Sequence, residues 1–189
     1  MGKIVISENI TLDGVVQDPA GVEGFRLGGW VGNALSRPAF GKVALEEALG
    51  AEALLQGRRT YEFLASVWPS REGPLADRLN SLPKYVVSST LKDPEWNNTT
   101  VLKGDVVDEV SKVKQEVDGE IVVAGSLRLV RTLLEHDLVD VLRLLVYPVV
   151  LGEGQRLFDQ TGEQRPVRLV ETRTVDDLAY LTYEPVRNE

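Results

Sequence analysis

The stretch Ala53-Leu54-Leu55-Gln56-Gly57-Arg58-Arg59-Thr60 decides the fold, because an apolar strand pattern ends there in a glycine and two arginines. Two further stretches follow the same plan, Tyr85-Val86-Val87-Ser88-Ser89-Thr90 and Ile121-Val122-Val123-Ala124-Gly125-Ser126. In an open α/β sheet the carboxyl ends of the strands line the ligand crevice. Small residues there let the backbone approach a ligand, and helix N-termini supply N–H groups for phosphate. Adjacent arginines indicate a ligand with several negative charges, and a phosphate-rich nucleotide fits best.

Strand and helix patterns alternate along most of the chain. Apolar runs predict strands at residues 3–6, 53–56, 84–88, 99–102, 120–124, 141–150, 167–174 and 178–184. Helical patterns are expected at residues 38–49, 58–67, 75–82, from 105 onward, and at 127–135. This order predicts an α/β fold with helices on both faces of a mostly parallel sheet and an antiparallel C-terminal edge. No repeat or composition break divides the chain, so a single domain over residues 1–189 is expected.

Composition excludes several classes of function. The net charge of -8 disfavours nucleic acid and anionic membranes as partners. The absence of cysteine excludes disulfides and thiol catalysis, and the single histidine, His136, cannot build a histidine metal cluster, so no metal site is expected. No signal segment is evident at the N-terminus, and the apolar run from Leu144 to Leu151 is too short to span a bilayer. A cytoplasmic protein is expected.

Two other segments lead to expectations about ligands and partners. The glycine-rich segment 7–36 is long for a loop inside a domain and carries Trp30, which favours a functional loop. Its part from Gly14 to Gly32 is expected to be flexible and to close over a ligand. Along the strand at 141–150, Arg143, Leu145 and Tyr147 need cover on the second face. A second subunit is the favoured cover, so the sequence predicts a homodimer.

Five segments together resemble the dihydrofolate reductase-like superfamily, and most closely its bacterial branch that shares the fold of the riboflavin-biosynthesis reductase domain. They occur in the order found in that family and cover most of the chain: Ile10–Gly14, Leu55–Tyr61, Val86–Ser89, Val122–Ser126 and Pro148–Gly154. The resemblance implies a three-layer α/β/α fold with NADPH as the ligand. It also implies roles for individual residues.

By this resemblance, Arg58 reaches the 2′-phosphate of NADPH, and Arg59 and Thr60, beside Gly57, reach the pyrophosphate. The remaining residues that the resemblance assigns to the cofactor are Ser88, Ser89 and Lys103 at the adenosine ribose phosphate, Gly125 and Ser126 along the pyrophosphate and nicotinamide, and Asn9 and Val16 beside the nicotinamide. Ser126 departs from the second glycine that is usual in the family.

Structural interpretations stay open beside these assignments. Ser88-Ser89 can end a strand, and Lys103-Gly104 is ordinary turn chemistry. Gly125-Ser126 can be a tight turn with a serine cap. Asp13-Gly14 is a turn signal first, with a proton donor as the minor alternative.

The resemblance predicts an NADPH-dependent reductase of a small heterocycle, either pteridine-like or aminopyrimidine-like. Trp30, Phe40 and Tyr147 are candidate aromatic residues for the substrate pocket. Folate-reducing members carry an acidic residue at the start of the first helix, whereas Phe40-Gly41-Lys42 offers no carboxylate, so dihydrofolate is not the expected substrate. No catalytic residue is assigned. The alternatives are a dinucleotide-binding or sensing domain without catalysis and a dimeric scaffold that has lost the chemistry.

Overall fold

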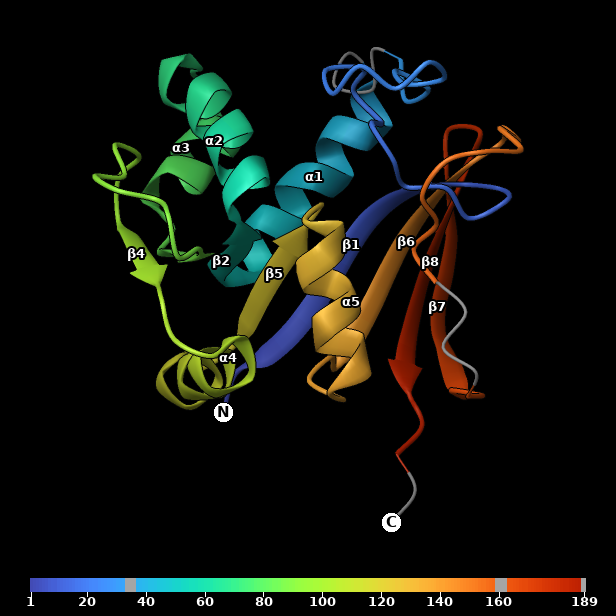
Figure 1. Cartoon of the computed structure of the whole chain (residues 1–189). Helices are drawn as coiled ribbons and strands as arrows, with labels where there is room; N and C mark the ends of the chain where they lie inside the picture. Colours follow the sequence, from blue (N-terminus) through green and yellow to red (C-terminus); the bar gives the residue numbers. More distant parts are fainter. Residues whose placement is uncertain (33–36, 159–162, 188–189) are drawn as a thin grey trace. The chain divides into compact units, whose positions relative to one another are not determined.

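The computed structural model describes residues 1–32, 37–158 and 163–187. The strands are β1 (Lys3–Thr11), β2 (Ala51–Gly57), β3 (Lys84–Val87), β4 (Thr99–Leu102), β5 (Glu120–Ala124), β6 (Val141–Tyr147), β7 (Val167–Val175) and β8 (Leu178–Pro185). The helices are α1 (Pro38–Gly50), α2 (Arg58–Val67), the short 3-10 helix η2 (Trp68–Ser70), α3 (Pro74–Ser81), α4 (Val106–Glu116) and α5 (Leu127–Glu135) (Figure 1).

The eight strands follow the order β4-β3-β2-β5-β1-β6-β8-β7. The pairs β2–β3, β2–β5 and β3–β4 are parallel, whereas β6–β8 and β7–β8 are antiparallel. The predicted α/β fold with a mostly parallel sheet and an antiparallel C-terminal edge is confirmed. The chain also divides into two compact units, residues 1–6 with 43–139 and residues 7–42 with 140–189, so β1 and α1 each contribute to both. No helix among the described residues is long and apolar enough to cross a membrane.

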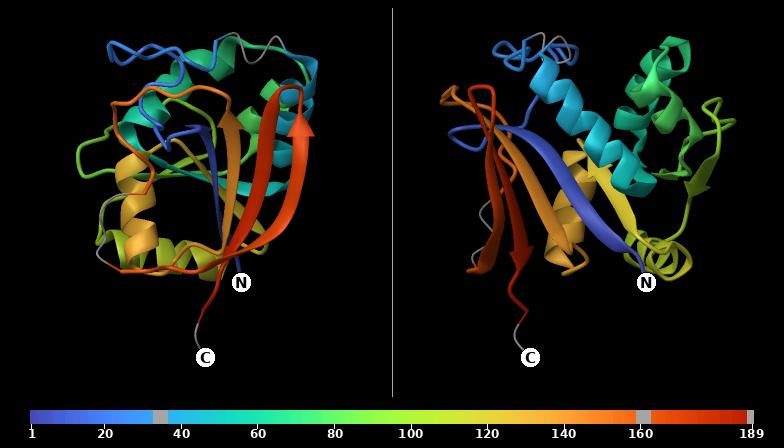
Figure 2. Two further views of the ribbon diagram at one scale, coloured as in Figure 1. Left: turned by 90° about the vertical axis from the view of Figure 1, so that its right-hand side faces the viewer. Right: turned by 180° about the vertical axis from the view of Figure 1, so that it is seen from behind.

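The first unit is built around the parallel strands β2 to β5. Leu55, Val86, Ile121 and Val123 are completely buried in these strands. Helices α4 and α5 bury one apolar face each, because their apolar residues recur at helical spacing. Helices α2 and α3 lie side by side and are joined through η2 (Figures 1 and 2).

The fully buried Lys84 joins several segments at one end of this unit through hydrogen bonds. The ammonium group of Lys84 donates to the carbonyls of Asn80, Leu82 and Asn97 at 2.8 to 3.1 Å, and it lies 4.3 Å from the ring centre of Trp96. Burial lowers the pKa of Lys84 to about 8. These bonds tie the end of α3 and the start of β3 to the segment that precedes β4.

In the second unit, β6, β8 and β7 lie next to one another in this order (Figure 2, left). Leu145 and Tyr147 of β6 are buried, with exposures of 7% and 3%. The ring of Trp30 packs edge-on against Tyr147 at 5.4 Å between ring centres. The expectation that these two residues need a second subunit for cover is therefore wrong. β6 has a neighbouring strand on each side and is not an edge. The low exposure of Leu145 and Tyr147 in the single chain shows that residues of the same chain cover them.

In the glycine-rich segment of this unit, the carboxylate of Asp18 binds several backbone N–H groups. Asp18 is 2% exposed, and its carboxylate accepts hydrogen bonds from the backbone N–H groups of Val22, Glu23 and Phe25. Gly28 packs so closely that a Cβ there would lie 2.3 Å from the carboxylate oxygen of Asp18. The backbone of residues 18–28 is therefore held by internal hydrogen bonds rather than by packing of apolar side chains.

Candidate functional site

Three polar segments of the first unit begin at the same edge of the parallel sheet. In the register, Gly57 pairs with Val87 and Val87 pairs with Leu102. The next residue on each of the three strands is therefore Arg58, Ser88 or Lys103. Three residues far apart in the sequence are brought together in this way, as the strand patterns predicted.

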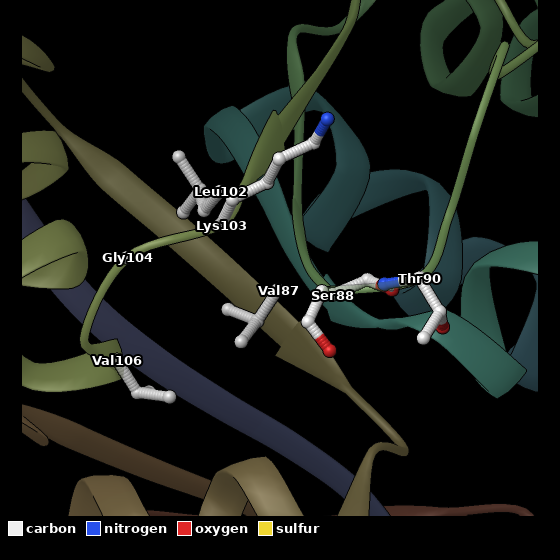
Figure 3. Close-up of a pocket in the computed structure, with 8 residues that line it drawn as sticks. Val87, Ser88, Thr90, Leu102, Lys103, Gly104 and Val106 are labelled. Carbon is white, nitrogen blue, oxygen red and sulfur yellow. Dashed lines mark hydrogen bonds between the residues drawn. The ribbon is translucent and has the colours of Figure 1, made fainter.

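A pocket of about 340 Å³ opens beyond the ends of β3 and β4. Figure 3 shows Ser88 and Thr90 following β3 and Lys103 following β4 around this pocket. The lining residues are Val87, Ser88, Ser89, Thr90, Leu102, Lys103, Gly104 and Val106. Hydroxyl and ammonium donors here share the wall with small aliphatic groups.

The cations at this edge are only partly engaged. Arg58 donates to the hydroxyl oxygen of Thr90 at 3.1 Å, and its guanidinium lies 3.8 Å from the carboxylate of Glu62, at the limit of an ion pair. Within the part of the chain that the structure describes, the side chains of Arg59 and Lys103 make no hydrogen bond or ion pair. Thr90 has no predicted role, but in the structure it is both a partner of Arg58 and a pocket residue.

The helices that begin at this edge, α2 and α5, differ from α3 and α4 in their first turns. Neither α2 nor α5 has a side-chain cap or an acidic residue in its first turn. By contrast, the carboxylate of Asp105 caps α4, and α3 carries Asp77 in its first turn. Backbone N–H groups in the first turn of a helix attract anions. The starts of α2 and α5 therefore keep backbone N–H groups that could donate hydrogen bonds to a bound anion.

A pair of reciprocal hydrogen bonds joins the turns that precede these two helices. The hydroxyl oxygen of Ser126 accepts from the N–H of Gly57 at 2.9 Å, and the N–H of Ser126 donates to the hydroxyl oxygen of Thr60 at 3.1 Å. Gly125 and Ser126 both have left-handed backbones, with φ of 66° and 60°. The alternative of a serine cap is wrong, because the Ser126 hydroxyl reaches across to β2 instead of capping α5.

The other predicted site residues lie in the second unit. Asn9 is half-buried in β1, and the N–H of the buried Val16 donates to the carbonyl of Gln155. Phe40 is half-buried in the first turn of α1. The indole N–H of Trp30 donates to the carbonyl of Gln17 at 2.9 Å, which fixes the ring that contacts Tyr147.

Tyr147 has a buried hydroxyl group without a hydrogen-bond partner among the described residues. Burial raises the pKa of Tyr147 to about 12, so the group is a neutral phenol at ordinary pH. Buried tyrosine hydroxyls are usually hydrogen-bonded, so this one is open to a polar partner.

The carboxylate of Asp13 has a structural role, because it accepts hydrogen bonds from neighbouring segments. Its carboxylate accepts from the hydroxyl of Thr11 at 2.7 Å and from the N–H groups of Leu151 and Gly152. The Thr11 hydroxyl, together with these N–H groups, lowers the pKa of Asp13 to about 2. A group with this pKa stays ionised at neutral pH and is a poor proton donor. The turn interpretation of Asp13-Gly14 agrees with this geometry.

The chain matches a known protein family and two curated proteins over most of its length. A model of the RibD C-terminal domain matches residues 2–180. The chain is 27% identical to the uncharacterized protein YyaP of Bacillus subtilis (strain 168), over 91% of this chain and 88% of that protein. It is 26% identical to the uncharacterized protein YwjB of the same organism, over 70% and 72% of the two chains.

Solved structures share the fold. A Shewanella sp. PV-4 protein provisionally assigned to riboflavin biosynthesis aligns with a TM-score of 0.74 at 21% identity, covering 98% of this chain and 99% of that one. A deaminase/5-amino-6-(5-phosphoribosylamino)uracil reductase of Thermotoga maritima aligns with a TM-score of 0.65 at 15% identity, and the match covers 98% of this chain and 57% of that one. The family match over nearly the whole chain means that this protein belongs to the RibD C-terminal domain family, within the dihydrofolate reductase-like superfamily that its sequence resembles.

Proposed function

We propose that the protein is an NADPH-dependent reductase of a small heterocycle, either pteridine-like or aminopyrimidine-like. The observation that carries this proposal is the gathering of anion-binding groups at one edge of the first unit. Two helix N-termini without side-chain caps, the cations Arg58, Arg59 and Lys103, and the hydroxyl pocket beyond β3 and β4 all belong to that unit. The family match to a domain of riboflavin biosynthesis supports reductase chemistry.

The residues present fit the cofactor in two places. Lys103, Ser88 and Ser89 at the pocket, with Arg58 beside Thr90, would hold the 2′-phosphate end. The first turns of α2 and α5 would hold the pyrophosphate, with Arg59 over it and the Gly125 backbone close to it. Thr60 and Ser126 add hydroxyl groups whose oxygens already accept backbone N–H groups, so their hydrogens remain available to a phosphate oxygen. NADPH supplies a hydride when it is bound.

We also propose roles for the residues that the sequence singles out for the nicotinamide and the heterocycle. Asn9 and Val16 would flank the nicotinamide. Trp30 and Phe40 offer rings on which a flat acceptor can stack. The neutral hydroxyl of Tyr147 can donate to a carbonyl oxygen or a ring nitrogen. Because the ionised carboxylate of Asp13 is held by three donors, the proton that completes the reduction would come from water or from the acceptor itself.

The test is a screen of aminouracils, pterins and dihydrofolate for NADPH consumption by the purified protein. We expect turnover with an aminouracil or a pterin. Dihydrofolate should be slower by about 10²–10⁴-fold, the usual cost of losing general acid assistance, because the first turn of α1 carries no carboxylate. Robust turnover of dihydrofolate at neutral pH would contradict this assignment of the acceptor.

A second candidate is a dinucleotide-binding or sensing domain without catalysis. One observation favours it, namely that Asp13 is committed to a turn and α1 begins without an acidic residue, so no proton donor is evident in those two places. Saturable NADPH binding without turnover of any compound in the screen would support this candidate over the reductase.

A further inference from the structure

The guanidinium group of Arg58 has two partners from different segments of the first unit. Its Nη1 donates to the hydroxyl oxygen of Thr90 at 3.1 Å, and its Nε lies 3.8 Å from the carboxylate of Glu62. Thr90 follows β3, whereas Glu62 lies one turn further along α2. The side chains of Arg58 and Glu62 are 45% and 52% exposed. Because contacts of this kind at the surface are weak, a change in either partner is sufficient to shift the position of this cation.

Of these two partners, only Thr90 connects Arg58 to the pocket beyond β3 and β4. Thr90 lines the pocket, whereas neither Arg58 nor Glu62 is among the described residues that line it. Figure 3 shows Thr90 next to Ser88 at the wall of this pocket. The hydrogen bond to Thr90 holds the guanidinium at that wall, whereas a closer ion pair with Glu62 would draw it back along α2. Thr90 therefore favours the position in which the charge of Arg58 acts at the pocket.

Backbone hydrogen bonds, and not the hydroxyl of Thr90, hold the turn that carries this residue. The hydroxyl oxygen of Ser88 accepts from the N–H of Thr90 at 3.2 Å and from the N–H of Leu91 at 2.9 Å. Serine commonly stabilises turns in this way. A substitution that removes only the hydroxyl of Thr90 therefore leaves the turn in place, so its effect on Arg58 can be measured separately.

The two partners also differ in what they do to the charge of Arg58. Arg58 is the first residue of α2, whose first turn carries no acidic residue, so its cation lies at the positive end of the helix dipole. The neutral hydroxyl of Thr90 orients the guanidinium without neutralising it, whereas the carboxylate of Glu62 neutralises it in part. A phosphate monoester offers several oxygens that match the arginine fork. Orientation by Thr90 keeps this fork available to such a group.

From this arrangement we propose that Thr90 is a positioning residue that holds Arg58 toward the pocket, and that Glu62 opposes it. The balance between the two sets how strongly a phosphate at the 2′ position of a ribose is preferred. This inference rests on the proposed function, because the ligand group is the 2′-phosphate of NADPH. It adds two residues that touch no part of the cofactor and act on its recognition through Arg58.

The test uses 2′-AMP and 5′-AMP, which carry the same phosphate at different ribose positions and need no turnover. Calorimetric titration of the native protein should show a preference for 2′-AMP. Thr90→Val should reduce this preference roughly threefold, because a neutral hydrogen bond contributes less than the charged contact that it positions. Thr90→Ala should behave in the same way, and Thr90→Ser should retain the preference. The matched control is Thr100→Val, exposed on β4 and outside the residues that line the pocket, which should change nothing.

A double-mutant cycle shows whether Thr90 acts through Arg58. In the Arg58→Ala background, Thr90→Val should have no further effect, because no guanidinium is left to position. An equal effect in both backgrounds would mean that Thr90 contacts the phosphate itself, and would overturn the positioning role. Glu62→Gln in the native background should shift the preference in the opposite direction, about twofold toward 2′-AMP. A decrease with Glu62→Gln would overturn the opposing role of Glu62.

These outcomes are separate from those that test the cofactor and the reductase activity. A native preference for 2′-AMP that is unchanged in Thr90→Val and Thr90→Ala would overturn this inference and leave the proposed cofactor site intact. Equal binding of the two nucleotides by the native protein would contradict both. Turnover of a heterocycle does not enter the experiment, so failure of the reductase activity is recognised independently.

Discussion

The carboxyl ends of β2 to β5 and the outer side of β7 both leave backbone groups without strand partners, but they do so with different chemistry. At the strand ends, small residues, hydroxyl groups and cations surround N–H groups at turns and helix starts. Along β7, the unpaired groups follow one strand and are flanked by exposed aliphatic and paired charged side chains. Converging donors suit a small anion, whereas a long edge suits another strand. The spatial arrangement of the unpaired backbone groups therefore indicates which class of ligand suits each region.

The largest effect on the proposed anion site is expected from a substitution of Gly125 that distorts its turn. This glycine has φ of 66°, and an added Cβ would lie 3.3 Å from the hydroxyl oxygen of Thr60. Gly125→Val would force a β-branched residue into a left-handed backbone and displace the turn. We expect NADPH affinity to fall on the order of 100-fold, or about 2.7 kcal/mol. Calorimetric titration measures this loss.

A matched control shows whether strain alone explains that loss. Gly73 also has a left-handed backbone, with φ of 106°, and an added Cβ would meet no atom within 4 Å. Gly73→Val should destabilise the fold but leave the affinity for NADPH within about twofold. An equal loss in both variants would show that the turn at Gly125 has no special place in the cofactor site.

The next effect concerns the charge at the strand ends. Arg58→Ala should remove most of the preference for NADPH over NADH, about tenfold, because a charge-assisted bond to the 2′-phosphate is worth about 1.5–3 kcal/mol. Parallel titrations of the two cofactors measure the ratio. Lys112→Ala is the control, since Lys112 is exposed on α4 and paired with Glu109. A ratio that is unchanged in Arg58→Ala would assign the 2′-phosphate to other residues.

At low pH, protonation of Asp13 should lower the stability of the second unit. The pKa of Asp13 is lower in the folded protein, about 2, than its ordinary value of 3.8. The unfolded chain therefore binds the proton more tightly, and this stabilisation is complete above pH 3.8 and is lost as the pH falls to about 2. The contribution is about 1 kcal/mol after solvent screening. Urea unfolding of Asp13→Asn should show a smaller decrease in stability over this range than the native protein, and an identical decrease would contradict the assignment.

The smallest effect is expected at the edge strand. Leu169→Lys should leave the affinity for NADPH within about twofold, because Leu169 lies on β7, outside the proposed cofactor site, and is half exposed. Calorimetric titration would measure the affinity, and a clear loss of cofactor binding would show that the two regions are not independent.

Local sequence signals predicted most elements of the fold. The strands at residues 99–102 and 120–124 and the helices at 58–67 and 127–135 have the expected bounds, because apolar periodicity and flanking small residues specify them locally. β6 was expected to extend to Val150 but ends at Tyr147, directly before Pro148. The cover of Tyr147 could not be predicted, because it depends on the packing of Trp30, which is distant in the sequence.

The contacts at the site that the sequence did not predict are hydrogen bonds between residues far apart in the sequence. Arg58 and Ser88 were singled out because their segments directly follow strand patterns, whereas Lys103 was implied by the family resemblance. The bond from Gly57 to the Ser126 hydroxyl joins residues 69 positions apart, and no periodicity signals it. Asp18 carried a weak signal, since aspartate before glycine-rich turns often accepts backbone N–H groups, but its burial depends on the packing of Gly28.

The most direct test of the central claim is calorimetric titration of the native protein with NADPH and NADH under identical conditions. The arrangement of Arg58, Ser88 and Lys103 at one sheet edge predicts saturable binding of one cofactor per chain, with NADPH bound about tenfold more tightly than NADH. Absence of saturable binding, or equal affinities for the two cofactors, would contradict the proposed cofactor site.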